Sequence, residues 1–369
     1  MGKIKYFAVV AAILISLALI GGYSVKNDSS SVKDYKTYYN TIKKALYKFD
    51  STLVINIYNY DNNVYTADTV KKVLEDNPQL RDNQIKYGLK VQKSLFITKM
   101  IFTFSYGESK ENLQNREKDI QNKVKEIVNK VIKPGMKDYE KEAALHDYIV
   151  NNSKYDERIN SGNMPKESYS AYGVLINGVG VCQSYALAMD RLLKACGIES
   201  MMVIGEANDG TGWISHGWNI VKIGGQYYHL DATWDDPVVK DGGNMSRYSY
   251  FNVTDEQIEK NHKWNKADYP KCNSTDYSFN NLNIAEKDSN GKAIIVTKNY
   301  EEFYKEVKKA LASGKASASF KILSFDNNGK NIENSIVRAY ESLSRYGGFT
   351  YLYHKDDMMN CGYVTVNFK

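Results

Sequence analysis

The chain has 369 residues, of which 43% are hydrophobic and 25% are charged, a composition typical of folded soluble domains. Its length allows two or three domains that each bury a core. The net charge of +6 comes from 49 basic and 43 acidic residues, and so small and scattered an excess argues against a nucleic-acid-binding protein.

The N-terminal residues are predicted to direct export. Lys3 and Lys5 precede an apolar stretch, residues 6–25, that contains no charged residue. A basic start before an apolar run is typical of a signal peptide, and this run is also long enough to span a bilayer as a helix. We therefore expect residues 1–25 to be a cleaved signal peptide or a membrane anchor, and the rest of the chain to be extracellular or at the cell surface.

The clearest breaks in the exported part are the Pro-Gly pair at residues 134–135 and Pro270. They predict an N-terminal α/β module (26–134), a central domain (135–275) and a C-terminal α/β module (276–369). Strands and helices alternate in a similar way in the two flanking modules, which suggests a single type of module.

In the N-terminal module, strands are predicted over 51–60 and 94–106, and a helix over 66–77. Residues 111–132 are predicted to form an amphipathic helix whose apolar face carries Ile120, Val124, Ile127, Val128 and Val131. In the C-terminal module, strands are predicted at 292–296 and 317–325, helices at 300–313 and 331–344, and two short strands at the end.

The central domain begins with a predicted helix over 138–156. A second helix is predicted to start at Cys182 and to end before Gly197, which suits a left-handed cap. Its apolar stripe consists of Tyr185, Met189, Leu192, Leu193 and Cys196. Three strands are expected to follow, over 200–207, 216–223 and 227–234.

The motif GVGVCQSYA, residues 178–186, places Cys182 in the first turn of that helix. Unpaired backbone N–H groups and the helix dipole stabilise a thiolate there. Gly178 and Gly180 allow positive φ and close backbone approach, which leaves room for a substrate beside the sulfur. This is the setting of an activated nucleophile, although an isolated cysteine is more often a small buried residue. The other cysteines are assigned to the core and not to disulfides: Cys196, Cys272 and Cys361.

A nucleophilic thiol needs a base and a group that orients the base. A two-residue turn at Gly224-Gly225 would join two strands and place Ile223 opposite Gln226. In that register His216 and Asp231 share one face of the sheet as diagonal neighbours, with their Cβ atoms about 7 Å apart or less. A three-residue loop would destroy this arrangement.

The other titratable residues receive simpler interpretations. His229 also falls on the shared face and ranks second as a base, because no carboxylate is evident beside it. His146 is expected to be packed or solvated, and His262 and His354 to lie in loops. Asp235 and Asp236 are explained by a turn before proline, and no metal site is predicted.

The motif GVGVCQSYA followed by SHGWNIVKIGGQYYHLDATWDDP (215–237) resembles the core of the transglutaminase-like superfamily. The resemblance runs from about Tyr139 to Pro270. It implies an α+β, papain-like fold with helices packed on an antiparallel sheet. It also implies that Cys182 is the nucleophile, His216 the general base and acid, and Asp231 the carboxylate that orients His216. Two residues differ from the commonest family pattern, which often has glycine at Ser184 and alanine at Gly217.

The resulting hypothesis is an exported, cofactor-independent acyl transferase or amide hydrolase that acts on protein or peptide substrates, including cell-wall-associated ones, through a thioester. The Cys182 N–H would stabilise the oxyanion with a second donor from among Gln183, Ser170 and Tyr172. Three tryptophans are candidates for the walls of a substrate groove, although filling the core is the simpler role for at least two of them: Trp213, Trp218 and Trp234.

Two alternatives stay open at this point. The first is a non-catalytic cell-surface binding or scaffolding protein that retains the fold, attached to a membrane if residues 6–25 are not removed. The second is an intracellular peptidase with an incidental apolar N-terminus. An intact Cys-His-Asp set favours catalysis, because a binding protein has no need of all three residues.

Overall fold

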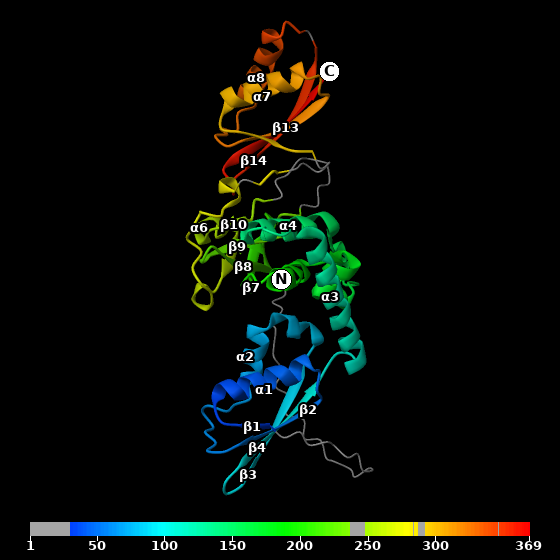
Figure 1. Cartoon of the computed structure of the whole chain (residues 1–369), viewed down its shortest axis with the longest axis vertical. Helices are drawn as coiled ribbons and strands as arrows, with labels where there is room; N and C mark the ends of the chain where they lie inside the picture. Colours follow the sequence, from blue (N-terminus) through cyan, green and yellow to red (C-terminus); the bar gives the residue numbers. More distant parts are fainter. Residues whose placement is uncertain (1–29, 237–247, 283, 287–291, 346) are drawn as a thin grey trace. The chain divides into compact units, whose positions relative to one another are not determined.

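A computed structural model describes most of the chain (Figure 1). The described residues are 30–236, 248–282, 284–286, 292–345 and 347–369. Helices are combined with mostly antiparallel sheets, so the protein is an α+β structure as predicted. The predicted signal peptide or anchor, residues 1–25, lies outside the described residues. Within the described part of the chain, no helix has both the length and the apolar character needed to span a bilayer.

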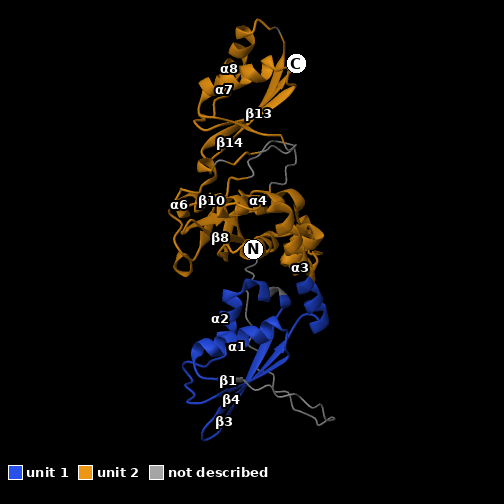
Figure 2. Cartoon of the chain, viewed as in Figure 1, with its two compact units in different colours: residues 1–118 blue, residues 119–369 orange. Residues whose placement is uncertain are grey.

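The chain divides into two compact units, residues 1–118 and 119–369 (Figure 2). The division falls within helix α3 (Lys110–Val131), which the sequence predicts over 111–132. The second unit contains both the central sheet and the C-terminal module. The finer division of the chain at residues 134 and 275 stays a prediction.

The first unit contains a four-stranded sheet in the order β1-β2-β4-β3, in which β1 and β2 are parallel and the other pairs antiparallel. Its elements are β1 (Ser30–Val32), α1 (Tyr35–Tyr47), β2 (Thr52–Ile57), α2 (Asp68–Asp76), β3 (Lys86–Lys93) and β4 (Thr98–Ser105). The Asp34 side chain caps α1 by accepting from the N–H of Thr37. Buried side chains of α1 and α2 pack with those of the sheet, including Ile42, Val70 and Phe102.

The C-terminal module repeats this topology. Its elements are β12 (Ile295–Thr297), α7 (Tyr300–Ala312), β13 (Ser317–Ile322), α8 (Gly329–Ser342), β14 (Phe349–Asp356) and β15 (Cys361–Phe368). The strand order is β12-β13-β15-β14, again with one parallel pair followed by two antiparallel pairs. The prediction that the two flanking modules are of one type is therefore confirmed at the level of topology.

The segment between these modules in the sequence forms a five-stranded antiparallel sheet in the order β10-β9-β8-β7-β11. The strands are β7 (Ser200–Asn208), β8 (Trp213–Ile223), β9 (Gln226–Leu230), β10 (Phe251–Val253) and β11 (His262–Trp264). Helices α4 (Asp138–Asn152) and α5 (Cys182–Ala195) share one core with this sheet. As predicted, α5 begins at Cys182, buries Tyr185, Met189, Leu192 and Leu193, and is followed by Gly197 at φ 77°.

The turn between β8 and β9 has the predicted register. Gly224 and Gly225 adopt φ of 58° and 84°, which suits a two-residue hairpin turn. Ile223 pairs with Gln226, and the ladder continues to Asn219 opposite Leu230. The side-chain face on which each residue of β8 lies follows from this register.

Two sequence predictions are wrong about strand ends. The strand predicted over 227–234 stops at Leu230, because the Asp231 carboxylate accepts the N–H groups of Thr233 and Trp234 and turns the chain. The strand predicted over 94–106 begins only at Thr98. Residues 94–97 form the turn of a β3–β4 hairpin whose first strand was not predicted, and neither was α1.

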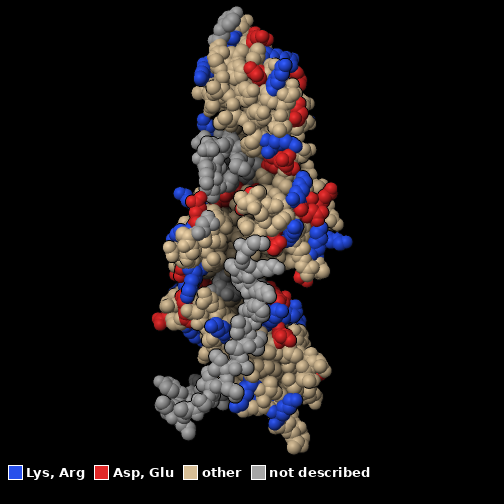
Figure 3. All heavy atoms as spheres, turned by 180° about the vertical axis from the view of Figure 1, so that it is seen from behind, with Lys and Arg blue, Asp and Glu red and all other residues tan. Residues whose placement is uncertain are grey.

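Charges of both signs are interspersed on the face seen in Figure 3, where Lys and Arg side chains lie among Asp and Glu side chains. No broad single-sign patch is visible on that face. This distribution agrees with the small net charge.

Candidate active site

The thiol of Cys182 is placed by a short parallel strand pair. Strand β6 (Val179–Gly180) pairs with β5 (Lys154–Tyr155), and the chain then enters α5. Gly178, at φ 66°, makes the sharp turn before β6. The N-cap residue of α5 is Val181, which has no polar side-chain atom to accept from the first-turn N–H groups. The positive end of α5 therefore lies beside the partly buried thiol.

Ser184 fits its site because Gly180 has no side chain. A Cβ at Gly180 would lie 2.5 Å from Ser184 Oγ and Cβ. The Ser184 hydroxyl donates to the Ser170 carbonyl at 2.5 Å and accepts the Val174 N–H at 3.0 Å. The serine thus ties the start of α5 to the preceding loop. Of the two glycines proposed to give positive φ, only Gly178 does so.

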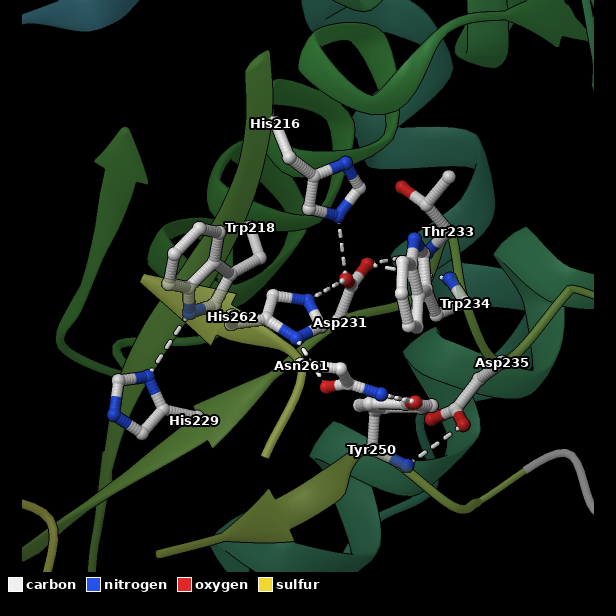
Figure 4. Close-up of polar contacts among 10 residues, drawn as sticks. All are labelled: His216, Trp218, His229, Asp231, Thr233, Trp234, Asp235, Tyr250, Asn261 and His262. Atoms are coloured by element: carbon white, nitrogen blue, oxygen red, sulfur yellow. Dashed lines mark hydrogen bonds and ion pairs between the residues drawn. The ribbon is translucent and has the colours of Figure 1, made fainter. Parts of the chain in front are cut away.

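His216 and Asp231 lie together and are buried (Figure 4). His216 on β8 places Nε2 2.6 Å from Asp231 Oδ2. The Cys182 thiol lies close enough to His216 to contribute to the rise of the His216 pKa. The structure therefore brings together the three residues predicted to act together. Because Nε2 faces Asp231, Nδ1 is the ring nitrogen available to the thiol.

The electrostatics favour a charged imidazole at His216. Burial by itself lowers the pKa of His216, but the charge and hydrogen bond of Asp231 outweigh it, and the Cys182 thiol adds to their effect, so that the pKa rises to about 10. Burial likewise raises the pKa of Asp231, but His216 and His262 outweigh it and hold that pKa well below the ordinary range. At neutral pH the pair is an imidazolium facing a carboxylate.

A second imidazole, that of His262, contacts the same carboxylate oxygen. His262 lies on β11, is fully buried and places Nε2 3.1 Å from Asp231 Oδ2. Its Nδ1 faces Asn261 Oδ1 at 2.7 Å, and the Asn261 amide in turn donates to Tyr250 Oη at 2.6 Å. The expectation of a loop position for His262 is wrong.

The place of His262 depends on a glycine in the neighbouring strand. Trp264 of β11 pairs with Gly205 of β7, where a Cβ would lie 2.1 Å from the Lys263 carbonyl oxygen. Only glycine allows β11 to approach so closely. The sequence does not predict this contact, because the short strand HKW carries no strong strand pattern.

His229 belongs to a separate buried network. Its Nε2 lies 2.9 Å from Asp255 Oδ1, so this imidazole also has a carboxylate partner, one that sequence spacing did not indicate. Its Nδ1 accepts the Trp218 indole N–H at 2.9 Å. The indole can only donate, so Nδ1 carries no proton and Nε2 carries one. Asp255 is therefore the hydrogen-bond acceptor for His229.

Two groups of donor atoms lie close enough to suggest a metal, and neither has the right chemistry. In the first, His229 is near Asp255 and Cys272, but the Trp218 N–H fixes the proton on the nitrogen that would have to bind the ion. In the second, His216 and His262 approach Asp231 at 2.6 and 3.1 Å. Two ligands on one tetrahedral ion lie about 3.3 Å apart, so these are hydrogen-bond distances.

Asp235 and His146 form a third buried pair. From the sequence, Asp235 was expected in a turn before proline, and His146 was expected to be packed or solvated. His146 Nε2 lies 3.1 Å from Asp235 Oδ2, and both side chains are fully buried. Asp235 Oδ1 accepts the Tyr250 N–H at 2.8 Å. This pair ties α4 to the loop that carries Asp231.

The predicted oxyanion donors are placed as follows. Gln183 follows Cys182 in the first turn of α5. The Ser170 hydroxyl donates to the Glu167 carbonyl at 2.9 Å, and Tyr172 packs against the main core. Tyr155 on β5, which sequence analysis did not consider, lies near Cys182. Burial raises the pKa of Tyr155, and the charges of Cys182 and Asp231 add to the shift.

The three predicted groove tryptophans occupy different environments. Trp218 is buried, and its ring lies among the imidazoles of His216, His229 and His262. Trp234 is partly buried, with its ring centroid 5.7 Å from that of His216. Trp213 is exposed and lies under the ammonium group of Lys263, 3.5 Å from its ring centroid. Only Trp234 is both near His216 and partly accessible.

Comparison with known families agrees with this geometry. Residues 125–232 match the model of the Transglutaminase-like superfamily, and the matched segment contains Cys182, His216 and Asp231. This segment is a transglutaminase-like domain. Proteins of this superfamily are usually cysteine-dependent enzymes. No curated protein matches the chain.

Several solved structures are similar to this chain. A transglutaminase is 12% identical, with 60% of this chain and 62% of that chain covered and a TM-score of 0.30. A proposed cysteine protease from Cytophaga hutchinsonii is 17% identical, with 40% and 64% covered and a TM-score of 0.27. An arylamine N-acetyltransferase from Bacillus cereus, described with a Cys-His-Glu triad, is 14% identical, with 35% and 50% covered and a TM-score of 0.26. The chain thus spans less than two thirds of the length of each.

Buried protonated groups predict how stability depends on pH. The pKa of Glu142 is raised to about 8 by burial, and that of His146 to about 9, where Asp147 and Asp235 outweigh burial. In the native state Glu142 and His146 keep their protons up to about pH 8 and 9, whereas the unfolded chain, with ordinary pKa values of 4.5 and 6.5, has largely lost them by pH 7. The free energy of unfolding therefore falls as pH rises toward these folded-state pKa values, and the fall ends above them.

Glu142→Gln tests this expectation, because glutamine keeps an oxygen for the Asn252 amide, which donates at 2.9 Å. The variant should lose up to about 1.4 kcal/mol per pH unit of the slope below pH 8, and little above pH 8, where native Glu142 is itself ionised. Urea unfolding at pH 7, 8 and 9 measures it, with Glu126→Gln on the exposed face of α3 as the control. Equal slopes in wild type and Glu142→Gln would show that Glu142 is ionised in the native state.

Proposed function

We propose that this protein is an exported cysteine-dependent acyl transferase or amide hydrolase that acts on protein or peptide substrates through a thioester. The observation that supports it most directly is the buried His216–Asp231 contact of 2.6 Å beside the Cys182 thiol. A structural cysteine in a core has no use for an oriented imidazolium. The family match over residues 125–232 also supports cysteine-dependent chemistry.

In the first half of the reaction, the Cys182 thiolate attacks a carboxamide or peptide carbonyl, and the oxygen becomes an oxyanion. The Cys182 N–H at the start of α5 stabilises this charge, with a second donor from Gln183 or Tyr155. His216 then donates the proton on Nδ1 to the leaving nitrogen. The C–N bond breaks, ammonia or an amine departs, and a thioester remains on Cys182.

In the second half, neutral His216 takes a proton from the acceptor, either water or a primary amine. The acceptor attacks the thioester carbonyl, the C–S bond breaks, and a carboxylic acid or a new amide is released with the thiolate restored. Asp231 stays ionised throughout, because its pKa is held far below neutrality. Both outcomes use the same residues, so access of water decides between them.

Thiol reactivity distinguishes an enzyme from a binding protein that retains the fold. At pH 6.5 iodoacetamide should modify Cys182 and spare Cys196, which is also partly buried and whose pKa is raised by burial. His216→Ala should lower the Cys182 rate about 100-fold. Peptide mass spectrometry after timed labelling measures both rates. Equal rates for the two thiols, unaffected by His216→Ala, would favour the binding protein.

Substrate chemistry is tested by incubating the protein with cell-surface protein extracts and a labelled primary amine. Wild type should either incorporate the amine or release ammonia or new amino groups, and Cys182→Ala should do neither. Incorporation indicates amide transfer, and release without incorporation indicates hydrolysis. Failure of both signals across varied substrates, with Cys182 still reactive toward iodoacetamide, would count against the proposed substrate class.

His262 is expected to act as a positioning residue through Asp231. His262→Gln should slow Cys182 alkylation at pH 6.5 about tenfold, the equivalent of one charge-assisted hydrogen bond. The acid limb of the pH profile of the Cys182 alkylation rate should move to higher pH, because His262 helps to lower the pKa of Asp231. His229→Gln is the control, since that imidazole is also buried against a carboxylate but bonds Asp255. Equal profiles for both variants would assign His262 a structural role only.

A further inference from the structure

The β3–β4 hairpin of the first unit ends in two exposed apolar side chains. Leu95 is 92% exposed and Phe96 is 80% exposed, the highest values among the large hydrophobic residues that the structure describes. Tyr58, which follows the end of β2 at the same end of the sheet, is 53% exposed. Single exposed apolar residues are common, but two large adjacent ones on a projecting turn are not.

Lysines lie along this hairpin, two of them beside the tip, and acidic residues are absent from the hairpin. Residues 86–105 contain no Asp or Glu and carry Lys86, Lys90, Lys93 and Lys99. Lys93 and Lys99 flank the turn, since they pair with Thr98 and Gln92. The hairpin therefore has an apolar tip, Leu95 and Phe96, with the positively charged Lys93 and Lys99 next to it. The charges of the whole chain are nearly balanced.

In the C-terminal module, the corresponding hairpin tip is covered by residues of the central domain. The β14–β15 turn carries Met358, which is 8% exposed and packs with Val203, Trp218 and Ile220 in the central domain. Asp356 at that turn accepts the Ser249 hydroxyl at 2.6 Å. One copy of the module thus docks through its hairpin tip, whereas the tip in the other copy is exposed and has the opposite charge.

We propose that the Leu95–Phe96 hairpin tip docks on the surface of an anionic lipid bilayer. The tip is convex, so it suits insertion between lipid headgroups better than it suits a flat protein surface, which would have to supply a pocket. Leucine and phenylalanine enter the acyl boundary, and the lysines contact anionic headgroups at the level just outside it. Tyr58 is suited to the same interfacial depth.

The sequence before the module is compatible with this placement. The uncharged stretch 6–25 ends five residues before β1 at Ser30, and it has the length and apolarity of a bilayer-spanning or membrane-targeting segment. A chain that carries such a segment is made at a membrane. The proposal rests on the hairpin residues themselves and is independent of the catalytic proposal.

An environment-sensitive dye at position 95 tests the docking. The full chain carries Leu95→Cys with Cys182→Ser and Cys196→Ser, so that the remaining thiols are buried. The matched control carries Lys86→Cys, at the far end of the same strand. Each protein is mixed with vesicles of phosphatidylcholine alone or with about a quarter phosphatidylglycerol, at low and high salt. Circular dichroism checks that both variants are folded.

The dye at position 95 should shift to the blue and be quenched by spin-labelled lipid on anionic vesicles, whereas the dye at position 86 should not. Lys93→Gln with Lys99→Gln should weaken the response about tenfold, and high salt should do the same. The proposal is overturned if position 95 stays water-exposed on anionic vesicles, or if both positions respond equally. It is also overturned if the dye at 95 responds to lipid-free acidic protein and not to vesicles, which would make the tip a protein-docking site.

Discussion

The candidate site depends on one buried carboxylate. Asp231 lies just past the end of β9, accepts two backbone N–H groups on one oxygen and faces two imidazoles on the other. An uncompensated charge at that depth would be prohibitively unfavourable, so the hydrogen bonds are a condition for its ionisation. Once ionised, Asp231 fixes the orientation of His216 and keeps it protonated, and those are the two properties that a cysteine nucleophile needs from its partner.

The sequence was sufficient where local patterns determine structure. The start of α5 follows from a glycine-rich turn before an apolar helical stripe, and Gly197 predicts its end. The register of β8 and β9 follows from the Gly224-Gly225 pair, and with it the pairing of His216 with Asp231. Family resemblance and spacing led to the same three residues, because both depend on this helix and this hairpin.

The sequence was insufficient where long-range contacts decide. His262 reaches Asp231 only because β11 adds to the edge of the sheet beside Gly205, a pairing between segments far apart in the chain. Asp235 and His146 are likewise partnered across 89 positions. The β3–β4 turn was missed for a different reason, since Leu95 and Phe96 have the composition of a strand but occupy a solvent-exposed turn.

The two flanking modules share one topology and differ in the contacts of their hairpin tips. In the C-terminal module the tip is buried against the domain that contains His216, so the module contributes Met358 to the cluster around Trp218. In the N-terminal module the tip is exposed and basic. Two modules of one topology can thus carry hairpins of different chemistry.

The most direct test of the central claim is the titration of His216, followed by NMR of isotope-labelled imidazoles in wild type and Asp231→Asn. The wild-type ring should remain protonated at pH 8, in keeping with a pKa of about 10, and the variant should lose its proton at a much lower pH, because burial then acts without the charge and hydrogen bond of Asp231. A wild-type ring that is neutral at pH 7, or one that titrates identically in the variant, would contradict the account.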